Sequence, residues 1–499
     1  MKKGVNKLMI YVLGVFLVTI SCNDEVSVEN TNELSQDTFF ESLSQIEAAA
    51  NAGYAQLQNG GLYQRYGYIL PDSFSDEMIT STDPNFIPSY QFKLTPSLLQ
   101  TSAYWNNCYN GIGACNFVID NEDVMRANSE GADFSDADID DALGQAHFLR
   151  GLYYFLLVKR YAGVPLLLEV QEVPAGLPRS TKDEVYEVII SDLEKAAELL
   201  YAKSSTEQGR ATQGAALGML GKVYLFRERY QDAKEALGLI TDYSLLPLED
   251  YNDNFNESGE HNDESMFEVN FSGDAEESDL WSQTGIGVSE VTFHAQEYAG
   301  WGNATPSQKM IDEFEEDDPR FKSAILLDGD PYGPDNAFIH TLRDATWYKF
   351  SQLYENETVT QNGSTNVRFL RYADVILMQA EVEHRLNNDP AAIAFLNQIR
   401  ERAELPLYGT QEMDDRGYPV ATPEGVFNAI VHERMVELCG EQHRYDDLVR
   451  WGLDVQELAV DDDGNSRGYN PDVHRLMPIP QVEIDANDMI GPEDQNPGY

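Results

Sequence analysis

Basic residues are scarce in this chain. Lysine and arginine total 34 against 85 aspartates and glutamates, which gives a formal net charge of -51 at pH 7. Nucleic-acid binding requires a concentrated positive face, and so few basic residues cannot assemble one. Anionic polysaccharides are disfavoured as well, although salt screens surface charges beyond about 8 Å at physiological ionic strength. We therefore exclude nucleic acid and expect an uncharged ligand.

Cysteine is also scarce, with four residues in a chain of 499. Cys108 and Cys115 are seven residues apart in a segment that should be helical, so their Cα atoms should lie about 10.5 Å apart, beyond the reach of a disulfide. No Cys-x-x-Cys pair with metal-site spacing is present in the sequence. We expect a protein held together by its core, without a metal or another cofactor.

Only one long apolar run occurs, and it lies near the N-terminus. Residues 8–20 follow a basic start, are too short to cross a bilayer comfortably, and are typical of a removed secretory signal. Cys22 follows after the small residue Ser21 and resembles the acylated cysteine of bacterial lipoproteins. We expect residues 1–21 to be a lipoprotein signal peptide, Cys22 to carry fatty acyl chains such as palmitate, and residues 22–32 to form a tether. A secreted protein without the anchor is the alternative.

Recognisable catalytic motifs are absent from the sequence. His432-Glu433 begins like a zinc metalloprotease motif, but Val436 stands where the second histidine is required. The stretch 461–463 resembles a calcium loop, but Ala459 occupies the first ligand position. No nucleophile elbow, P-loop or dinucleotide fingerprint appears in a plausible setting. We expect a protein that is not an enzyme, although a pair of carboxylates for glycoside hydrolysis is a three-dimensional feature that sequence does not exclude.

The chain is instead rich in helical periodicity. Helices are predicted over residues 39–57, 102–121, 138–161, 182–201, 210–240, 371–385, 390–403 and 424–438. The intervening part is rich in Gly, Asn, Asp, Ser and aromatic residues, with short strand-like pieces such as 265–271. We expect a mainly α single domain over residues 33–499. It comprises an N-terminal helical half (33–250), a loop-rich, few-stranded region (251–365) and a C-terminal helical half (366–499).

Internal repetition indicates how these helices pack. In 210–240, apolar and small residues, with Gly221 at the closest point, stand at the spacing of a tetratricopeptide helix pair. The same intervals recur from Ile376 to Ile399, with Ala380 in the place of Gly221. Gly151 fits the first helix of a third copy, whose partner is expected from residue 182 onward. Such pairs bury their apolar faces against their neighbours, so the copies should stack.

Several segments resemble the SusD/RagB family of Bacteroidetes outer-membrane lipoproteins. The most specific are "RFLRYADVILMQAEVEHRLNNDPAAIAFLNQIRERAELP", "VFNAIVHERMVELCGEQHRYDDLVRWG" and the closing "RLMPIPQVEIDANDMIGPEDQNPGY". Further matches are "TPSQKMIDEFEEDDPRF", "YWNNCYNGIGACNFVID" and "AHFLRGLYYFLLVKRYAGVPL". Together they run in family order over about residues 37–499.

The resemblance implies a tetratricopeptide-like scaffold that carries an irregular region. It also implies a protein that binds oligosaccharide or polysaccharide at the outer membrane, facing the cell exterior, and delivers it uncleaved to a SusC-like TonB-dependent β-barrel transporter. Two alternatives stay open. One is a surface glycoside hydrolase, and the other is a structural or peptide-binding helical-repeat lipoprotein.

A dense charge pattern follows one of the family segments. Its members are spaced to pair along a helix turn and with neighbouring helices. We expect them to serve structure rather than binding. The residues are Arg434, Glu437, Arg444, Asp446, Asp447 and Arg450.

A sugar-binding protein needs flat aromatic faces and hydrogen-bonding partners for hydroxyl groups. Periodicity or strand-like alternation assigns Trp105, Trp347 and Trp451 to packing. Trp281, Tyr298 and Trp301 stand in polar, Gly-containing stretches without a period that would bury them, and Asn303 lies beside them. We predict three stacking platforms and a hydroxyl partner there. A second aromatic loop cluster supplies the weaker candidates Tyr66, Tyr68 and Phe86.

Overall fold

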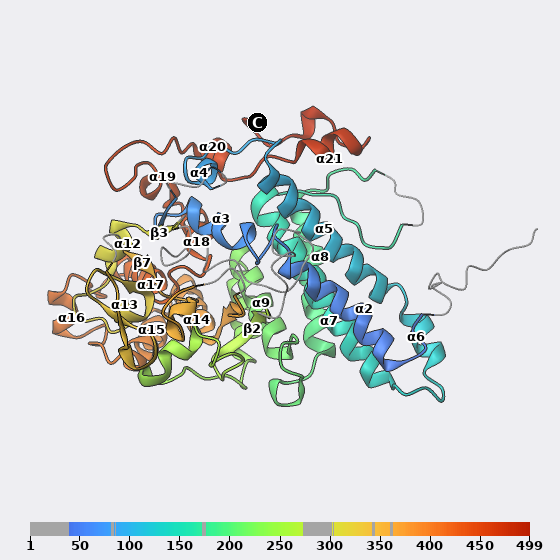
Figure 1. Cartoon of the computed structure of the whole chain (residues 1–499), viewed down its shortest axis with the longest axis horizontal. Coiled ribbons are helices and arrows are strands. Elements are labelled where there is room, and N and C mark those ends of the chain that lie inside the picture. The colour runs from blue at the N-terminus through green and yellow to red at the C-terminus, as the bar shows by residue number, and fades with distance from the viewer. Residues whose placement is uncertain are drawn as a thin grey trace, which may run out of the picture.

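The computed structural model describes residues 39–80, 84, 86–171, 176–272, 302, 304–341, 345–359 and 363–499. Helices dominate this part of the chain, and its strands form short two-stranded pairs (Figure 1). The predicted mainly α architecture with a loop-rich, few-stranded middle is therefore confirmed. Within these residues, no helix combines the length and the apolar composition needed to cross a bilayer.

The N-terminal half is built from long helices that lie side by side (Figure 1). They are α2 (Leu43–Ala55), α5 (Leu99–Ile119), α7 (Asp136–Tyr161), α8 (Lys182–Leu199), α9 (Gln213–Phe226) and α10 (Tyr230–Gly238). The start of α8 is determined by local sequence. The hydroxyl oxygen of Thr181, the residue before the helix, accepts the Glu184 N–H at 3.3 Å. The Glu184 carboxylate in turn accepts the Thr181 N–H at 2.8 Å, a reciprocal cap that satisfies two otherwise unpaired groups of α8.

The C-terminal half repeats this helical design. Its main helices are α14 (Tyr372–Arg385), α15 (Asp389–Arg402), α17 (Pro423–Glu437) and α18 (Arg444–Trp451). Pro390 lies in the first turn of α15, where its missing N–H removes no helical hydrogen bond. Ala380 of α14 and Leu396 of α15 are buried in one apolar cluster, so the second predicted helix pair is confirmed.

Small residues stand where the N-terminal helix pairs come closest. At Gly221 in α9, an added Cβ atom would lie 2.4 Å from Cδ2 of Leu237 in α10. At Gly151 in α7, it would lie 3.1 Å from Cγ of Leu193 in α8. These close approaches confirm the predicted tetratricopeptide-like packing, including the third copy.

The variant Gly221→Ala is expected to lower the free energy of unfolding by about 1–3 kcal/mol, because its methyl group overpacks a buried helix contact. Gly238, at the end of α10, is the matched control, since an added Cβ atom there meets nothing within 4 Å. Gly238→Ala should leave stability unchanged or raise it by up to about 1 kcal/mol. Urea unfolding of both variants checks this, and equal effects would contradict the packing described.

The strands connect regions that are far apart in sequence. The pairs are β1 (Met78–Ile79) with β3 (Thr305–Pro306), β2 (Ser265–Val269) with β8 (Val367–Arg371), β4 (Ile325–Leu326) with β7 (Thr346–Trp347), and β5 (Pro331–Tyr332) with β6 (Phe338–Ile339), all antiparallel. The β1–β3 pair joins the N-terminal half to the middle region.

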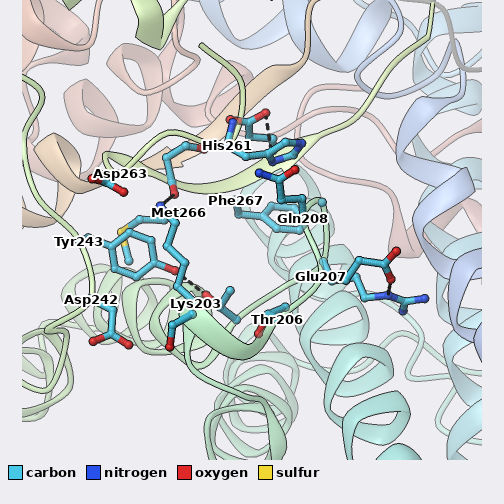
Figure 2. Close-up of a pocket in the computed structure, with 16 residues that line it drawn as sticks. Lys203, Thr206, Glu207, Gln208, Asp242, Tyr243, His261, Asp263, Met266 and Phe267 are labelled. Carbon is cyan, nitrogen blue, oxygen red and sulfur yellow. Dashed lines mark hydrogen bonds and ion pairs between the residues drawn. The ribbon is translucent and has the colours of Figure 1, made fainter. Parts of the chain in front are cut away.

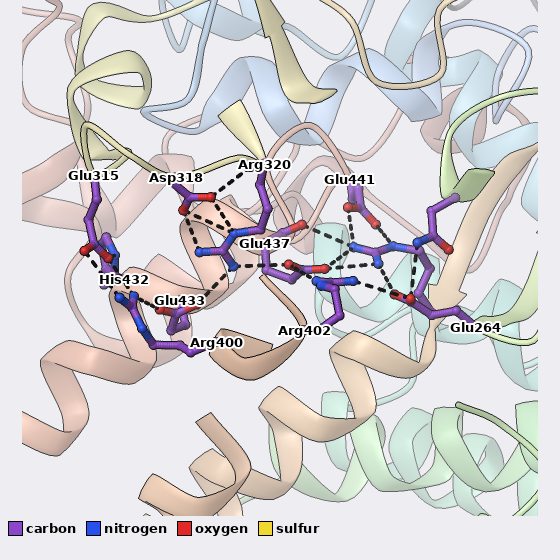
Figure 3. Close-up of polar contacts among 12 residues, drawn as sticks. Glu264, Glu315, Asp318, Arg320, Arg400, Arg402, His432, Glu433, Glu437 and Glu441 are labelled. Carbon is purple, nitrogen blue, oxygen red and sulfur yellow. Dashed lines mark hydrogen bonds and ion pairs between the residues drawn. The ribbon is translucent and has the colours of Figure 1, made fainter. Parts of the chain in front are cut away.

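A buried network of arginines and carboxylates joins the middle region to α15 and α17 (Figure 3). Arg320 donates to Glu433 at 3.1 Å and to Glu437 at 3.2 Å, both on α17. Arg402 donates to Glu437 at 2.5 Å. Burial alone would raise the pKa of Glu437, but Arg402, Arg371 and Arg320 hold it well below its usual range.

The charged residues singled out in the sequence all pair within the fold, as predicted. Arg434 pairs with Asp374 and Asp447, Arg444 with Asp76, Asp446 with Lys159 and Arg160, and Arg450 with Glu381 and Asp447. Several of these partners lie hundreds of positions away in sequence. The network therefore ties the two halves of the chain together.

The three cysteines among the described residues are buried free thiols: Cys108, Cys115 and Cys439. The prediction that Cys108 and Cys115 form no disulfide is confirmed. Burial raises the pKa of the Cys108 thiol well above its usual value, which favours the unreactive protonated form. Cys22 lies outside the described residues.

Candidate ligand-binding groove

A groove of about 560 Å³ opens beside the β1–β3 pair. We call it the β1–β3 groove. Its walls come from residues 75–79 after α3 (Tyr66–Phe74), from 307–313 at and on α12 (Gln308–Glu313), and from 456–467, which begin in α19 (Asp454–Glu457). These elements lie together beside α4 (Ile87–Tyr90) in Figure 1. Its volume falls within the range of about 300–1,000 Å³ that is usual for ligand sites.

Asp76 holds the base of the groove together. Its carboxylate accepts a two-point contact from Arg444, at 2.8 and 2.9 Å, and lies 2.6 Å from the ammonium of Lys309. Its backbone carbonyl accepts the Ser307 hydroxyl at 2.6 Å. Burial alone would raise the pKa of Asp76, but Arg444 and Lys309 hold it well below its usual range. The base is therefore a fixed charge cluster.

Among the described residues, one aromatic side chain, Tyr90, lines the groove, and it is partly exposed. The guanidinium of Arg467 lies 4.4 Å from its ring centroid and supports the ring by a cation–π contact. Arg467 is itself immobilised, because its N–H groups donate to the carbonyls of Ser75 at 2.6 Å, Ser73 at 2.9 Å and Tyr90 at 3.1 Å. A rigid ring beside fixed polar groups is the arrangement that a pyranose requires.

The aspartate-rich stretch 461–463 forms part of the rim. Asp461 turns its Oδ1 atom to its own loop and accepts the N–H groups of Asp463 at 3.1 Å and Asn465 at 2.8 Å. Asp462 accepts the N–H of Gln308 at 2.6 Å and so links the rim to α12. These carboxylates organise backbone, which is a sufficient structural reason for the stretch.

Metal-binding geometry is found at one place in the described part of the chain. Glu315, His432 and Glu433 bring three ligand atoms within 4.8 Å of one another. Arg400 already donates to Glu315 at 2.6 Å and to Glu433 at 2.7 Å. Burial alone would lower the pKa of His432, but the neighbouring glutamates raise it to about 9. The cluster is an ion-pair site, since a guanidinium and an imidazolium already occupy its carboxylates.

The first set of predicted platforms, Trp281, Tyr298 and Trp301, lies outside the described residues, as does Asn303. The second set is packed into the core: Tyr66 is 2%, Tyr68 5% and Phe86 0% exposed. The expectation of an open aromatic loop there is corrected, because residues 66–74 form the helix α3, which is buried throughout. In this conformation the three rings present no open face to a ligand.

Sequence reasoning missed Tyr90 as a candidate. It closes the stretch "DPNFIPSY", four positions after Phe86, and no periodic signal separates the two rings. Their difference arises from tertiary structure. Phe86 faces the core, whereas Tyr90 meets Arg467 from a segment 377 positions further along the chain.

A second groove, of about 510 Å³, lies where the α8–α9 connection meets β2 (Figure 2). Its aromatic rings are Phe267, which is 3% exposed, and Tyr243, which has the Lys203 ammonium 4.7 Å from its centroid and Tyr372 stacked at 6.4 Å. Lys203 also donates to the carbonyls of Asn262 and Ser265, at 2.5 and 3.2 Å. Because Tyr243 and Phe267 are both buried and Lys203 is already hydrogen-bonded, this groove is less suited to a sugar than the β1–β3 groove.

Comparison with known proteins identifies the family to which this chain belongs. A family model described as "SusD family" matches residues 263–499, and one described as "Starch-binding associating with outer membrane" matches residues 27–225. The chain therefore belongs to the SusD/RagB family. Proteins of this family bind glycans without cleaving them, so the chain is a non-catalytic protein associated with the outer membrane.

Individual relatives agree over nearly the whole length. A SusD-like protein of Formosa agariphila is 26% identical, with 99% of each sequence covered. The crystal structure of a SusD superfamily protein from Bacteroides vulgatus is 28% identical, with a TM-score of 0.76 over 93% of this chain and 100% of that one. A laminarin-binding SusD-like protein is 25% identical, with a TM-score of 0.72 over 91% of this chain and 99% of that one.

Proposed function

We propose that this protein captures an oligosaccharide or polysaccharide in the β1–β3 groove and delivers it to a SusC-like TonB-dependent β-barrel transporter. One observation carries the choice of groove. The β1–β3 pair holds residue 79 against residue 305, and the partly exposed ring of Tyr90 lines the groove beside this pair. Trp301 and Asn303 are within four positions of Thr305 in sequence.

The expected affinity follows from stacking. Each platform buries roughly 50–100 Å² of apolar surface at about 25 cal/mol/Å², which contributes on the order of 1–2.5 kcal/mol. Tyr90 would be one platform, and Trp281, Tyr298 and Trp301 the others, with Asn303 as a hydroxyl partner. Two or three such contacts give a dissociation constant in the millimolar to micromolar range.

We further propose that Cys22 is acylated and anchors the protein to the outer membrane, facing the cell exterior. Two or more acyl chains make such attachment stable, whereas one chain is marginal. Residues 22–32 would then act as the tether. The net charge of -51 supports an uncharged glycan as the ligand. Laminarin, the uncharged glucan bound by one similar protein, is therefore the first probe.

The platforms are tested by affinity electrophoresis in gels that contain laminarin or other uncharged polysaccharides. The double variant Trp281→Ala/Trp301→Ala should bind its best glycan at least tenfold more weakly, because two stacking contacts are lost. Tyr201→Ala is the matched control, since Tyr201 is 40% exposed and does not line the groove. Unchanged affinity of the double variant would falsify the platform assignment.

The same preparation distinguishes the alternatives. Release of reducing ends from the polysaccharide would favour a surface glycoside hydrolase. Retention of peptides, but of no glycan, would favour a peptide-binding helical-repeat lipoprotein. The proposed function predicts retention of an uncharged glycan with no new reducing ends.

A further inference from the structure

Two cationic side chains line the β1–β3 groove, and both are already engaged within the protein. Arg467 is 5% exposed and donates to the backbone carbonyls of Ser75 and Ser73. Lys309 is more accessible, with 36% of its side chain exposed. Among the described residues that line the groove, Lys309 is therefore the cation best placed to meet a ligand.

Lys309 is held between two carboxylates from different walls. Its ammonium lies 2.6 Å from Oδ2 of Asp76 and forms a second ion pair with Glu457 of α19. Burial opposes its charge, but Asp76 and Glu457 together raise the pKa of the ammonium above its usual value. We call this arrangement the Lys309 bridge. It keeps the lysine charged and leaves its charge fully compensated.

The charges around the bridge leave no positive excess. Arg444 balances Asp76, and Lys309 balances Glu457. The remaining ionisable groups that line the groove are acidic apart from Arg467, and they include Asp461 and Asp462. An anionic sugar would thus meet like charge, whereas hydroxyl groups can donate to the carboxylate oxygens.

We infer that Lys309 determines specificity in this groove: compensated by Glu457, it admits uncharged, hydroxyl-rich glycans and gives uronic or sulfated sugars no counter-charge. The inference rests on the proposed function, because it assigns selectivity to the same groove. Glu457 is the partner that controls the outcome. Arg444 already balances the charge of Asp76. The loss of Glu457 alone would therefore leave the charge of Lys309 uncompensated at the groove.

A purely structural bridge would join the walls without affecting selectivity. The two roles differ in what Glu457→Gln should do. If the Lys309 bridge only stabilises the fold, Glu457→Gln lowers stability and gains no affinity for anionic glycans. If Lys309 sets specificity, the variant gains affinity for anions, and the added change Lys309→Met removes that gain.

The local charge around Lys309 is measured first, in the absence of any glycan. Folded protein is acetylated with an uncharged N-hydroxysuccinimide ester and, in parallel, with its sulfonated, anionic analogue, and Lys309 modification is quantified by mass spectrometry. The ratio of the anionic to the uncharged rate reports the local charge. Glu457→Gln should raise this ratio about threefold to tenfold, because one neighbouring negative charge is removed.

A matched control exists on the surface. Lys195 pairs with Glu198 at 3.0 Å, and both are exposed, so Glu198→Gln should change the corresponding ratio at Lys195 by less than about twofold. An unchanged ratio at Lys309 in folded Glu457→Gln would overturn the inference. Thermal unfolding of each variant shows whether the fold is retained. If Glu457→Gln does not fold, Glu457→Ser provides the same measurement.

Selectivity is then measured with laminarin and with the same polymer after carboxymethylation. The wild-type protein should be retained by the neutral gel and not by the anionic one. Glu457→Gln should gain retention on the anionic gel by about threefold to tenfold, and Glu457→Gln/Lys309→Met should lose it. Equal retention of the wild type on both gels would overturn the inference. Retention on neither gel would count against the proposed glycan function, while the acetylation ratio still decides the state of Lys309.

Discussion

Arg371→Met is expected to lower the free energy of unfolding by about 3–5 kcal/mol, the largest effect of any single substitution considered for this protein. Arg371 is fully buried at the end of β8 and donates to Glu441 at 2.7 and 2.8 Å and to Glu437 at 3.2 Å. It also pairs with Glu264, just before β2. Methionine fills similar space but leaves three buried carboxylates short of a cation. Urea denaturation at pH 7 measures the loss.

The control for this prediction is Arg229→Met. Arg229 pairs with Asp232 at 2.6 Å, but both side chains are about two-fifths exposed, so the change should stay within about 0.5 kcal/mol. A similar loss in the two variants would contradict the structural role given to the buried network.

The loss in Arg371→Met should also depend on pH. The pKa of Glu437 is held well below its usual range in the folded protein, chiefly because Arg402, Arg371 and Arg320 outweigh burial. A carboxyl with a depressed folded-state pKa contributes stability above its unfolded pKa of about 4.3, and this contribution is lost as the pH falls. The difference between wild type and Arg371→Met should therefore shrink below about pH 4.

Tyr90→Ala is expected to weaken glycan binding by roughly five- to sixtyfold, which corresponds to the loss of one stacking platform of about 1–2.5 kcal/mol. Isothermal titration with the glycan found by gel retention measures this change. Tyr90→Phe keeps the ring above Arg467 and removes only the hydroxyl group, so it should stay close to wild type. Equal binding by Tyr90→Ala and wild type would place the sugar elsewhere.

The helices could be predicted because their causes are local. Periodic apolar residues, caps such as Thr181 and small residues such as Gly221 act within one or two turns or within one helix pair. Sequence therefore locates α7 and α8 to within a few residues. It also shows that the charged residues near Arg434 are structural, because so many opposite charges stand within reach of one another.

The hydrogen-bond and ion-pair partners of the buried side chains could not be predicted, since most of them lie far away in sequence. Arg320 meets Glu433 across 113 positions, and Tyr68 donates to the carbonyl of Gly440 across 372 positions. The two-residue strands β1 and β3 carry no detectable pattern, although they define the groove. Glycine and tyrosine in the stretch before Phe74 suggested an open loop, but tertiary packing makes it a buried helix.

The family resemblance supplied what composition and periodicity could not: a class of ligand and a non-catalytic role. It did not identify Tyr90 or Lys309. Those two residues enter the account only through the folded walls of the β1–β3 groove, which bring residues 75–79, 307–313 and 456–467 together.

A crystal structure of the protein with an uncharged oligosaccharide that it retains would show directly where and how the glycan binds. We expect an intact sugar chain in the β1–β3 groove, with one pyranose ring on Tyr90 and hydroxyl groups within hydrogen-bond distance of Glu457 or Asp461. A sugar bound in the Lys203–Tyr243 groove instead, or cleaved products in the β1–β3 groove, would contradict it.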